Sequence, residues 1–208
     1  MAAEATHVVL TELVFDEFFS YFSKSDFIIG TLFPDIRYLG VIDRARTHLA
    51  DFDLKYIQSE ESAFIAGMKF HHLVDQIREH FMVEHGLYSL CPKFDYQTQA
   101  IKLLEDERYY SKIDTWSLER AYLEGIPDEE AGFGIAEASI QKWHSILQAY
   151  FLQPPTDLSR TEFMASIGFK KEIADSFNGY LQEIRKNNVF SIIDDFFRVF
   201  PELVKNSA

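Results

Sequence analysis

The amino-acid sequence predicts an all-α protein, a single domain of roughly seven to nine helices. Apolar residues recur every three or four positions along most of the chain, which is the period of a helix with one buried face. No stretch of more than a few residues alternates between apolar and polar side chains, as a half-buried strand does. The 208 residues are 47% hydrophobic and include 20 phenylalanines, enough for one domain with a large core.

The first two predicted helices cover about residues 8–23 and 27–33. The longer one carries an apolar stripe with the helical period, formed by Leu10, Leu13, Val14, Phe18, Tyr21 and Phe22. Pro34 cannot continue a helix, so residues 34–40 are expected to form a turn and loop. Residues 40–58 show no clear period.

A long third helix is expected over about residues 60–82, because Ser59 can cap its start and acidic residues follow in the first turn. Three further helices are predicted by their apolar period, over about residues 96–110, 116–124 and 135–152. The proline pair 154–155 ends the last of them.

Three more helices are expected beyond this proline pair. Ser159 and Glu162 have the spacing of a capping box, which predicts a helix start. Apolar periods then predict helices over about residues 173–184 and 190–200. The last one carries an apolar stripe that includes Phe196, Phe197, Phe200 and Leu203. Such a stripe most often belongs to a core, but it can also hold two copies of a chain together as a homodimer.

The charge and the single cysteine bear on the class of protein. The 33 acidic and 20 basic residues give a net charge of −13, so nucleic-acid binding is not expected. Most carboxylates, including the run 105–107, are expected to be solvated. Cys91 is the only cysteine, which excludes an internal disulfide. The apolar run 27–33 is too short to span a bilayer and no signal peptide is evident. We therefore expect a cytoplasmic protein without stable membrane insertion.

The densest group of metal-binding residue types lies in the predicted helix 60–82. His71, Asp75 and Glu79 recur at intervals of four. His72 is three residues before Asp75, so all four side chains can lie along one side of the helix. Imidazole and carboxylate are ligands of zinc, iron and manganese. The alternative is a set of solvated or hydrogen-bonded polar side chains on a helix face.

Four short motifs follow one another in the first 85 residues: Thr6-His7, Gly30-Thr-Leu-Phe-Pro34-Asp35-Ile36, Arg46-Thr47-His48, and Ala66-Gly67 followed by His71 and Asp75. Their order and spacing resemble the zinc-dependent phospholipase C family, which is related to the S1/P1 nucleases. Members of that group are all-helical and bind a cluster of zinc ions. The resemblance implies a phospholipase C/P1 nuclease-like fold.

The same resemblance implies a set of metal ligands: His7, Asp35, His48, His71 and Asp75. His72 is expected either to orient one of these ligands or to bind a second ion. Each residue also has an ordinary alternative, such as a polar position near an N-cap for His7, a turn cap for Asp35 and a surface position for His48. Residues 1–86 are thus the expected metal-site half, and 87–208 the helical remainder.

The chain departs from that family in two respects. The phospholipase pattern begins with a tryptophan whose free amine helps to bind metal, but here the first tryptophan is Trp116. The family also has a later pair of histidines and a His-x-x-x-Glu helix, whereas only His144 follows residue 86 and Gln148 stands four residues after it. We therefore expect one or two zinc ions rather than three, with iron or manganese as alternatives.

A metal ion at such a site lowers the pKa of bound water, which can then attack phosphorus. Asp75 and Glu79 are the catalytic candidates, with Glu79 as the general base. Three nearby arginines either hold a phosphate or are ordinary surface charges: Arg37, Arg44 and Arg46. The expected function is hydrolysis of a small phosphoester or a lipid. The alternative is a non-catalytic helical interaction protein with a structural or vestigial metal site.

Overall fold

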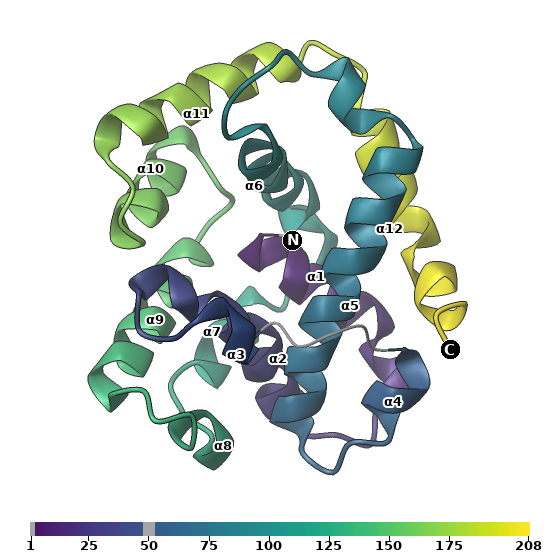
Figure 1. The fold of residues 1–208 in the computed structure, drawn as a ribbon, viewed down its shortest axis with the longest axis vertical. Helices are drawn as coiled ribbons and strands as arrows, with labels where there is room; N and C mark the ends of the chain where they lie inside the picture. The colour runs from purple at the N-terminus through teal and green to yellow at the C-terminus, as the bar shows by residue number, and fades with distance from the viewer. Residues whose placement is uncertain (1–2, 48–52) are drawn as a thin grey trace.

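The structure is a computed structural model that describes residues 3–47 and 53–208. These residues form twelve α-helices and three short 3-10 helices, and they contain no strand. The all-α prediction is confirmed. The long helix α5 (Ala63–Glu84) runs through the middle of one compact domain, and the start of α1 (Glu4–Phe18) lies near its centre (Figure 1).

The first part of the chain contains α1, α2 (Lys24–Leu32), the 3-10 helix η1 (Phe33–Leu39), α3 (Arg44–Thr47), α4 (Leu54–Gln58) and α5. The second part contains η2 (Leu87–Leu90), α6 (Gln97–Tyr109), η3 (Tyr110–Lys112), α7 (Trp116–Tyr122), α8 (Asp128–Ala131), α9 (Glu137–Tyr150), α10 (Asp157–Ser166), α11 (Lys171–Ile184) and α12 (Val189–Lys205). All nine helices expected above are present. The number exceeds seven to nine because α3, α4 and α8 have only four or five residues, too few to show a period.

Helix α1 starts and ends about one turn earlier than the predicted range 8–23. Two N-caps were also predicted one turn away from their true positions. Ser62, not Ser59, caps α5, and its hydroxyl accepts a hydrogen bond from the backbone N–H of Ile65 at 3.3 Å. Thr156, not Ser159, caps α10, and Ser159 supplies the second half of that capping box. In both places two hydroxyl side chains stand one turn apart, and the local pattern does not distinguish them.

Helices α2 and α5 pack closely because glycine stands at both points of nearest approach. A Cβ atom on Gly30 would lie 2.0 Å from the carbonyl oxygen of Phe64, and one on Gly67 would lie 2.1 Å from that of Phe27. Only glycine fits at these positions. This close packing places Thr31, near the end of α2, against α5, and its hydroxyl donates a hydrogen bond to the carbonyl oxygen of Gly67 at 3.3 Å.

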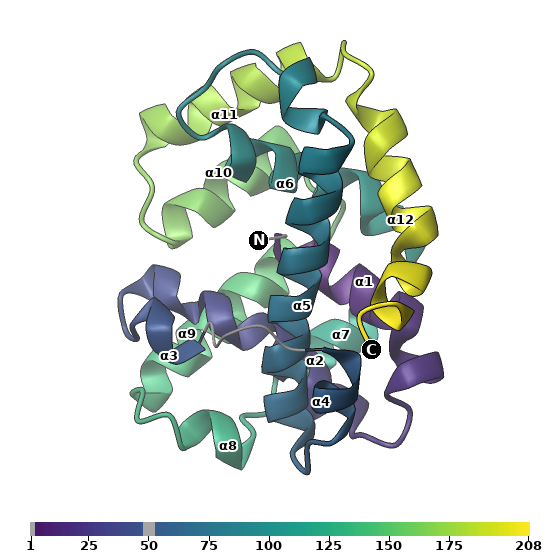
Figure 2. The same cartoon turned by 45° about the vertical axis from the view of Figure 1, so that its right-hand side comes forward.

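The apolar stripe of α12 lies against α5, and the two helices run side by side in both views (Figures 1 and 2). Phe196 and Phe200 are fully buried. The ring of Phe196 lies 5.3 Å from that of Phe81 on α5. These two phenylalanines belong to the chain's own core, and the homodimer stays a prediction. None of the described helices has the length and apolar character needed to cross a membrane.

The acidic run 105–107 is not the solvated face that was expected. Glu105 and Asp106 are fully buried, and Glu107 is half-buried. Each has a partner distant in sequence: Arg78 for Glu105, Thr6 for Asp106, and both Arg160 and Arg185 for Glu107. The expectation failed because nothing in the local sequence reveals these partners.

Candidate metal centre

The first turn of α1 is held in place by a side chain of α6. Ala3, at the N-cap position, offers no side-chain hydrogen bond. Instead, Asp106 Oδ1 accepts hydrogen bonds from both the backbone N–H and the hydroxyl of Thr6, each at 2.7 Å. Asp106 therefore does across the fold what a cap residue does locally. Burial raises the pKa of Asp106 to about 7, although these hydrogen bonds oppose the rise.

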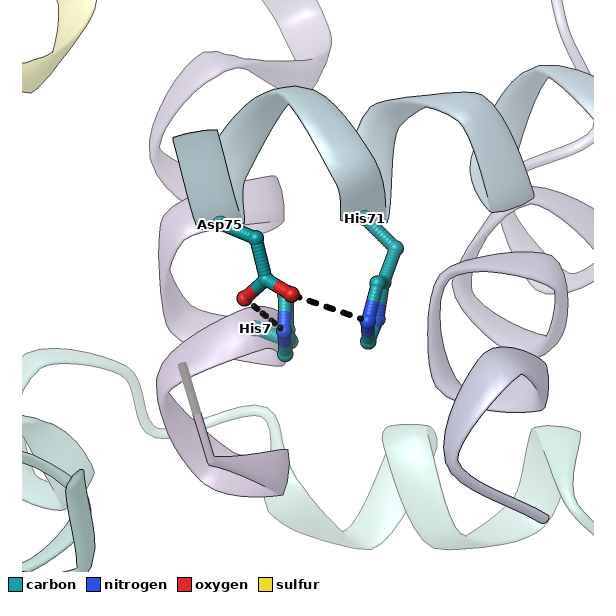
Figure 3. A group of neighbouring side chains, drawn as sticks. All are labelled: His7, His71 and Asp75. Atoms are coloured by element: carbon teal, nitrogen blue, oxygen red, sulfur yellow. Dashed lines mark ion pairs between the residues drawn. The ribbon is translucent and has the colours of Figure 1, made fainter. Parts of the chain in front are cut away.

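His7 follows Thr6 on α1 and faces His71 and Asp75 on α5 (Figure 3). Its Nε2 atom lies 3.4 Å from Asp75 Oδ1, and His71 Nε2 lies 3.5 Å from Asp75 Oδ2. The two imidazole rings stack, with centroids 3.9 Å apart. One nitrogen or oxygen atom from each residue lies within 4.8 Å of the others, and all three side chains are buried. Three of the six predicted ligands thus form one group, here called the His7–His71–Asp75 group.

His71 is oriented by the backbone of α2. Its Nδ1 atom lies 2.8 Å from the carbonyl oxygen of Thr31, which can only accept a hydrogen bond. Nδ1 therefore carries a proton, and in the neutral ring Nε2 presents its lone pair. Because Nε2 faces a carboxylate oxygen of Asp75, two acceptors confront each other unless a proton or a metal ion lies between them. Metal-binding histidines are commonly fixed in this way.

His7 is the least satisfied member of the group. It is fully buried, and neither ring nitrogen forms a hydrogen bond with the part of the chain that the structure describes. Burying polar atoms without such partners is costly. Burial, with the charge of His71, lowers the pKa of His7 to about 4. The ring is therefore neutral near pH 7, which is the form that binds metal.

The other two members stabilise each other as an ion pair. Burial favours the neutral form of Asp75, but the charge of His71 is the largest effect in the other direction, and the Asp75 pKa lies well below its usual range. Burial likewise favours neutral His71, but the charge of Asp75 outweighs it and raises the His71 pKa. A metal ion must displace the proton from His71 Nε2, so binding is expected to strengthen as the pH rises.

The separations between the donor atoms suit a metal ion, but the lone pairs of the two imidazoles do not point at a common position. Separations of 3.4 and 3.5 Å are long for hydrogen bonds but match the edge of a tetrahedron, about 3.4 Å for bonds of about 2.1 Å. Two imidazoles and a carboxylate suit zinc, iron or manganese. The lone pairs lie in the planes of the stacked rings, which lie only 12° apart, so the rings must tilt to converge on one ion.

The remaining predicted site residues lie elsewhere. Asp35 is buried and pairs with Arg37 at 2.9 Å, and its charge contributes to the raised pKa of His71 and opposes the lowering of the His7 pKa. His72 is half-buried and is not part of the group. Glu79 accepts hydrogen bonds from Arg78 at 3.0 Å and from the Tyr88 hydroxyl at 2.8 Å. His48 lies outside the described residues. The three arginines 37, 44 and 46 line one shallow hollow.

Two charged residues near the group were not predicted. Glu4 is buried one turn before His7, and burial, together with Asp35, raises its pKa well above the usual range. Lys102 of α6 is also buried. With Asp35 and Arg37, these residues line one end of a cavity of about 200 Å³. The three-residue spacing of Glu4 and His7 could have indicated Glu4, but nothing local marks Lys102.

Comparisons of the chain with family models, curated proteins and solved structures gave no match. The resemblance to zinc-dependent phospholipase C and the S1/P1 nucleases therefore rests on the short motifs alone. Of the residues in those motifs, the structure brings together His7, His71 and Asp75.

Proposed function

We propose that this protein binds a divalent metal ion through His7, His71 and Asp75 and hydrolyses phosphoesters. The observation that supports this most strongly is the state of His7. It is neutral, fully buried and without a hydrogen-bond partner in the described chain, yet it stands at metal-ligand spacing from a carboxylate. Such an imidazole destabilises the fold unless it gains a partner, and a metal ion is the partner that this donor set fits.

The residues around the group have complementary roles in this proposal. When bound, the metal lowers the pKa of a water molecule and neutralises charge on the phosphate. The water oxygen bonds to phosphorus, the phosphorus–oxygen bond to the alcohol breaks, and the alcohol leaves with a proton. Asp35 and Glu4 line the cavity, and Asp35 acts on both imidazoles, so Asp35 is better placed than Glu79 to take the proton from water. Arg37 and Lys102 hold the phosphate oxygens.

A second candidate is a non-catalytic interaction protein with a structural metal ion. The full burial of both imidazoles favours it, because structural sites are closed whereas catalytic sites keep one position open to water or substrate. The two candidates share the metal ligands and differ in turnover.

Metal content tests the part that both candidates share. Untagged protein loaded with zinc and freed of excess ion should retain about one ion per chain by mass spectrometry, as expected for one such ligand set. The variant His71→Ala should lose it. His80→Ala is the matched control, because His80 lies on the same helix with an exposed side chain paired to Glu84. Equal metal content in wild type and His71→Ala would remove both candidates.

Turnover separates the two candidates. Bis(4-nitrophenyl) phosphate should be hydrolysed by the metal-loaded protein and not after treatment with a chelator. Asp35→Asn should reduce this rate while retaining the metal, because Asp35 is not part of the His7–His71–Asp75 group. A metal-loaded protein without activity on phosphodiesters and phosphomonoesters would favour the structural ion.

A further inference from the structure

The cavity beside the candidate metal centre has a charged end and an apolar end. Glu4, Asp35, Arg37 and Lys102 line the charged end. The other walls come from α6, α10, α11 and the segments next to them, and consist mainly of Tyr96, Leu103, Phe163, Met164, Ile167, Phe169 and Phe177. Three of the charged residues come from the first part of the chain, whereas Lys102 and the apolar residues named here come from the second part. This combination is typical of sites for small molecules with one polar and one apolar group.

The charged end offers two cations to an anionic group. Lys102 is only 5% exposed, and among the described residues no carboxylate lies within ion-pair distance of its ammonium. Arg37 is partly occupied, since it pairs with Asp35 and lies over the ring of Tyr38 at 4.3 Å. A buried ammonium at the wall of a cavity is favourable when an anion lies beside it.

The size of the cavity limits what can enter. A cavity of about 200 Å³ is close to the roughly 150 Å³ that holds a benzene ring in an apolar protein interior. It is smaller than the roughly 300–1,000 Å³ usual for drug-sized ligands. A single ring or a short alkyl chain fits this volume, whereas two long acyl chains do not.

We propose that the cavity binds the phosphate ester of a compact apolar alcohol. The phosphate lies at Lys102 and Arg37, and one ring or short alkyl group lies among Phe163, Phe169 and Phe177. The inference rests on the proposed function for the reaction that follows, but the binding itself needs no metal ion. It names single-ring and short-chain phosphoesters, rather than double-chain lipids, as the substrate class.

Binding without turnover tests this inference. We would titrate the full chain, in the presence of a chelator, with phenylphosphonate and with methylphosphonate by calorimetry. Phenylphosphonate should bind at least about tenfold more tightly, since the ring buries its area in the cavity. Vesicles of phosphatidylcholine containing phosphatidic acid should not bind.

Two substitutions test which part of the ligand each end of the cavity contacts. Phe169→Ala should weaken phenylphosphonate about tenfold and leave methylphosphonate unchanged, because Phe169 is a half-buried wall of the apolar end. Lys102→Met should weaken both ligands about tenfold by removing the charge. The matched controls are Phe190→Ala and Lys112→Met, which change residues outside the cavity. Ile167→Ala replaces Phe169→Ala if the latter fails to fold.

The outcomes separate this inference from the proposed function. Equal affinity for the two phosphonates, binding of the vesicles alone, or no binding of either phosphonate would each overturn it. Equal effects of Phe169→Ala and Phe190→Ala would overturn it too. If the chain binds phenylphosphonate but takes up no metal, this inference is supported and the proposed function is contradicted. If the chain binds metal but neither phosphonate, the proposed metal site is supported and this inference is contradicted.

Discussion

Helix α5 carries two buried ionic clusters barely one turn apart, and they differ in how completely the protein satisfies them. Arg78 is fully buried, with a two-point contact to Glu105 at 2.5 and 2.9 Å and further bonds to Glu79 and Tyr88. In the His7–His71–Asp75 group the two histidine–carboxylate ion pairs are longer, at 3.4 and 3.5 Å, and His7 has no hydrogen bond within the described chain.

The difference teaches how a structural cluster can be distinguished from a binding site. Both clusters are buried and both join α5 to another helix, so burial and charge alone do not separate them. Around Arg78, hydrogen-bond geometry is complete and no further partner is needed. Around His7, the donor atoms are spaced for an ion rather than for one another. This contrast agrees with a structural role for Arg78–Glu105 and supports the proposal that the His7–His71–Asp75 group binds a metal ion.

The largest effect should come from breaking the structural cluster. Arg78→Met leaves Glu105 buried without its partner, so the free energy of unfolding should fall by about 3–5 kcal/mol in urea denaturation. Arg108→Met is the control, because Arg108 makes a similar two-point contact to Asp194 at the surface and should cost about 1 kcal/mol or less. Equal losses would show that burial does not distinguish the two pairs.

The second effect concerns the dependence of stability on pH. The pKa of His7 is about 4 in the fold and near 6.5 when unfolded, so protons bind preferentially to the unfolded chain in this window. Stability from neutral His7 is present above pH 6.5 and lost as the pH falls toward 4, by roughly 3 kcal/mol. Asp106 acts in the opposite direction, since its pKa is raised to about 7.

The variant His7→Gln isolates the contribution of His7 to this pH dependence. Asp106 is present in both the variant and the wild type, so its contribution cancels when the two are compared. Urea denaturation between pH 4.5 and 7, in a chelator, should show that wild type loses more stability on acidification than His7→Gln. The exposed His80→Gln should behave as wild type. If the free energy of unfolding depends on pH in the same way in wild type and His7→Gln, folding does not change the pKa of His7.

The third effect is stabilisation by metal. An ion that binds only the folded chain should raise the free energy of unfolding by about 2.7 kcal/mol at a concentration of one hundred times its Kd. Asp75→Asn should lose most of this gain with zinc, and Arg78→Met should keep it despite its lower starting stability. If Asp75→Asn gains as much as wild type, zinc binds somewhere other than this group.

The smallest effect concerns the close packing that sets the position of His71. Gly67→Ala places a methyl group against the backbone of Phe27 and should cost about 2 kcal/mol. Gly179→Ala is the matched control, since its Cβ meets nothing within 4 Å, and it should be neutral or slightly stabilising. If Gly67→Ala also proves neutral, α2 can move away from α5 and the position of Thr31 is not fixed by this contact.

The long helices could be predicted because each carries its own evidence. An apolar stripe repeats within α5 or α12 without reference to any other part of the chain. Short helices such as α3 and α8 lack room for a repeat and were missed. The choice between Thr156 and Ser159 as the cap of α10 depends on which backbone N–H groups are left unpaired, and two hydroxyls one turn apart look alike in the sequence.

Only the part of the candidate site that lies on a single helix could be predicted from residue spacing. His71 and Asp75 stand four residues apart on one helix, so their proximity follows from the sequence. His7 was added by resemblance, because no local rule connects residues on α1 and α5. Glu105 and Asp106 were misassigned to a solvated face, since their burial depends on Arg78 and Thr6.

The contact between Asp106 and Thr6 has a consequence for protein synthesis. The turn of α1 that carries His7 is completed by a side chain one hundred residues later. A ribosome that has made only residues 1–86 has therefore already synthesised every member of the His7–His71–Asp75 group, but not the residue that fixes the start of α1. We expect the group to reach its folded arrangement only after α6 has emerged from the ribosome.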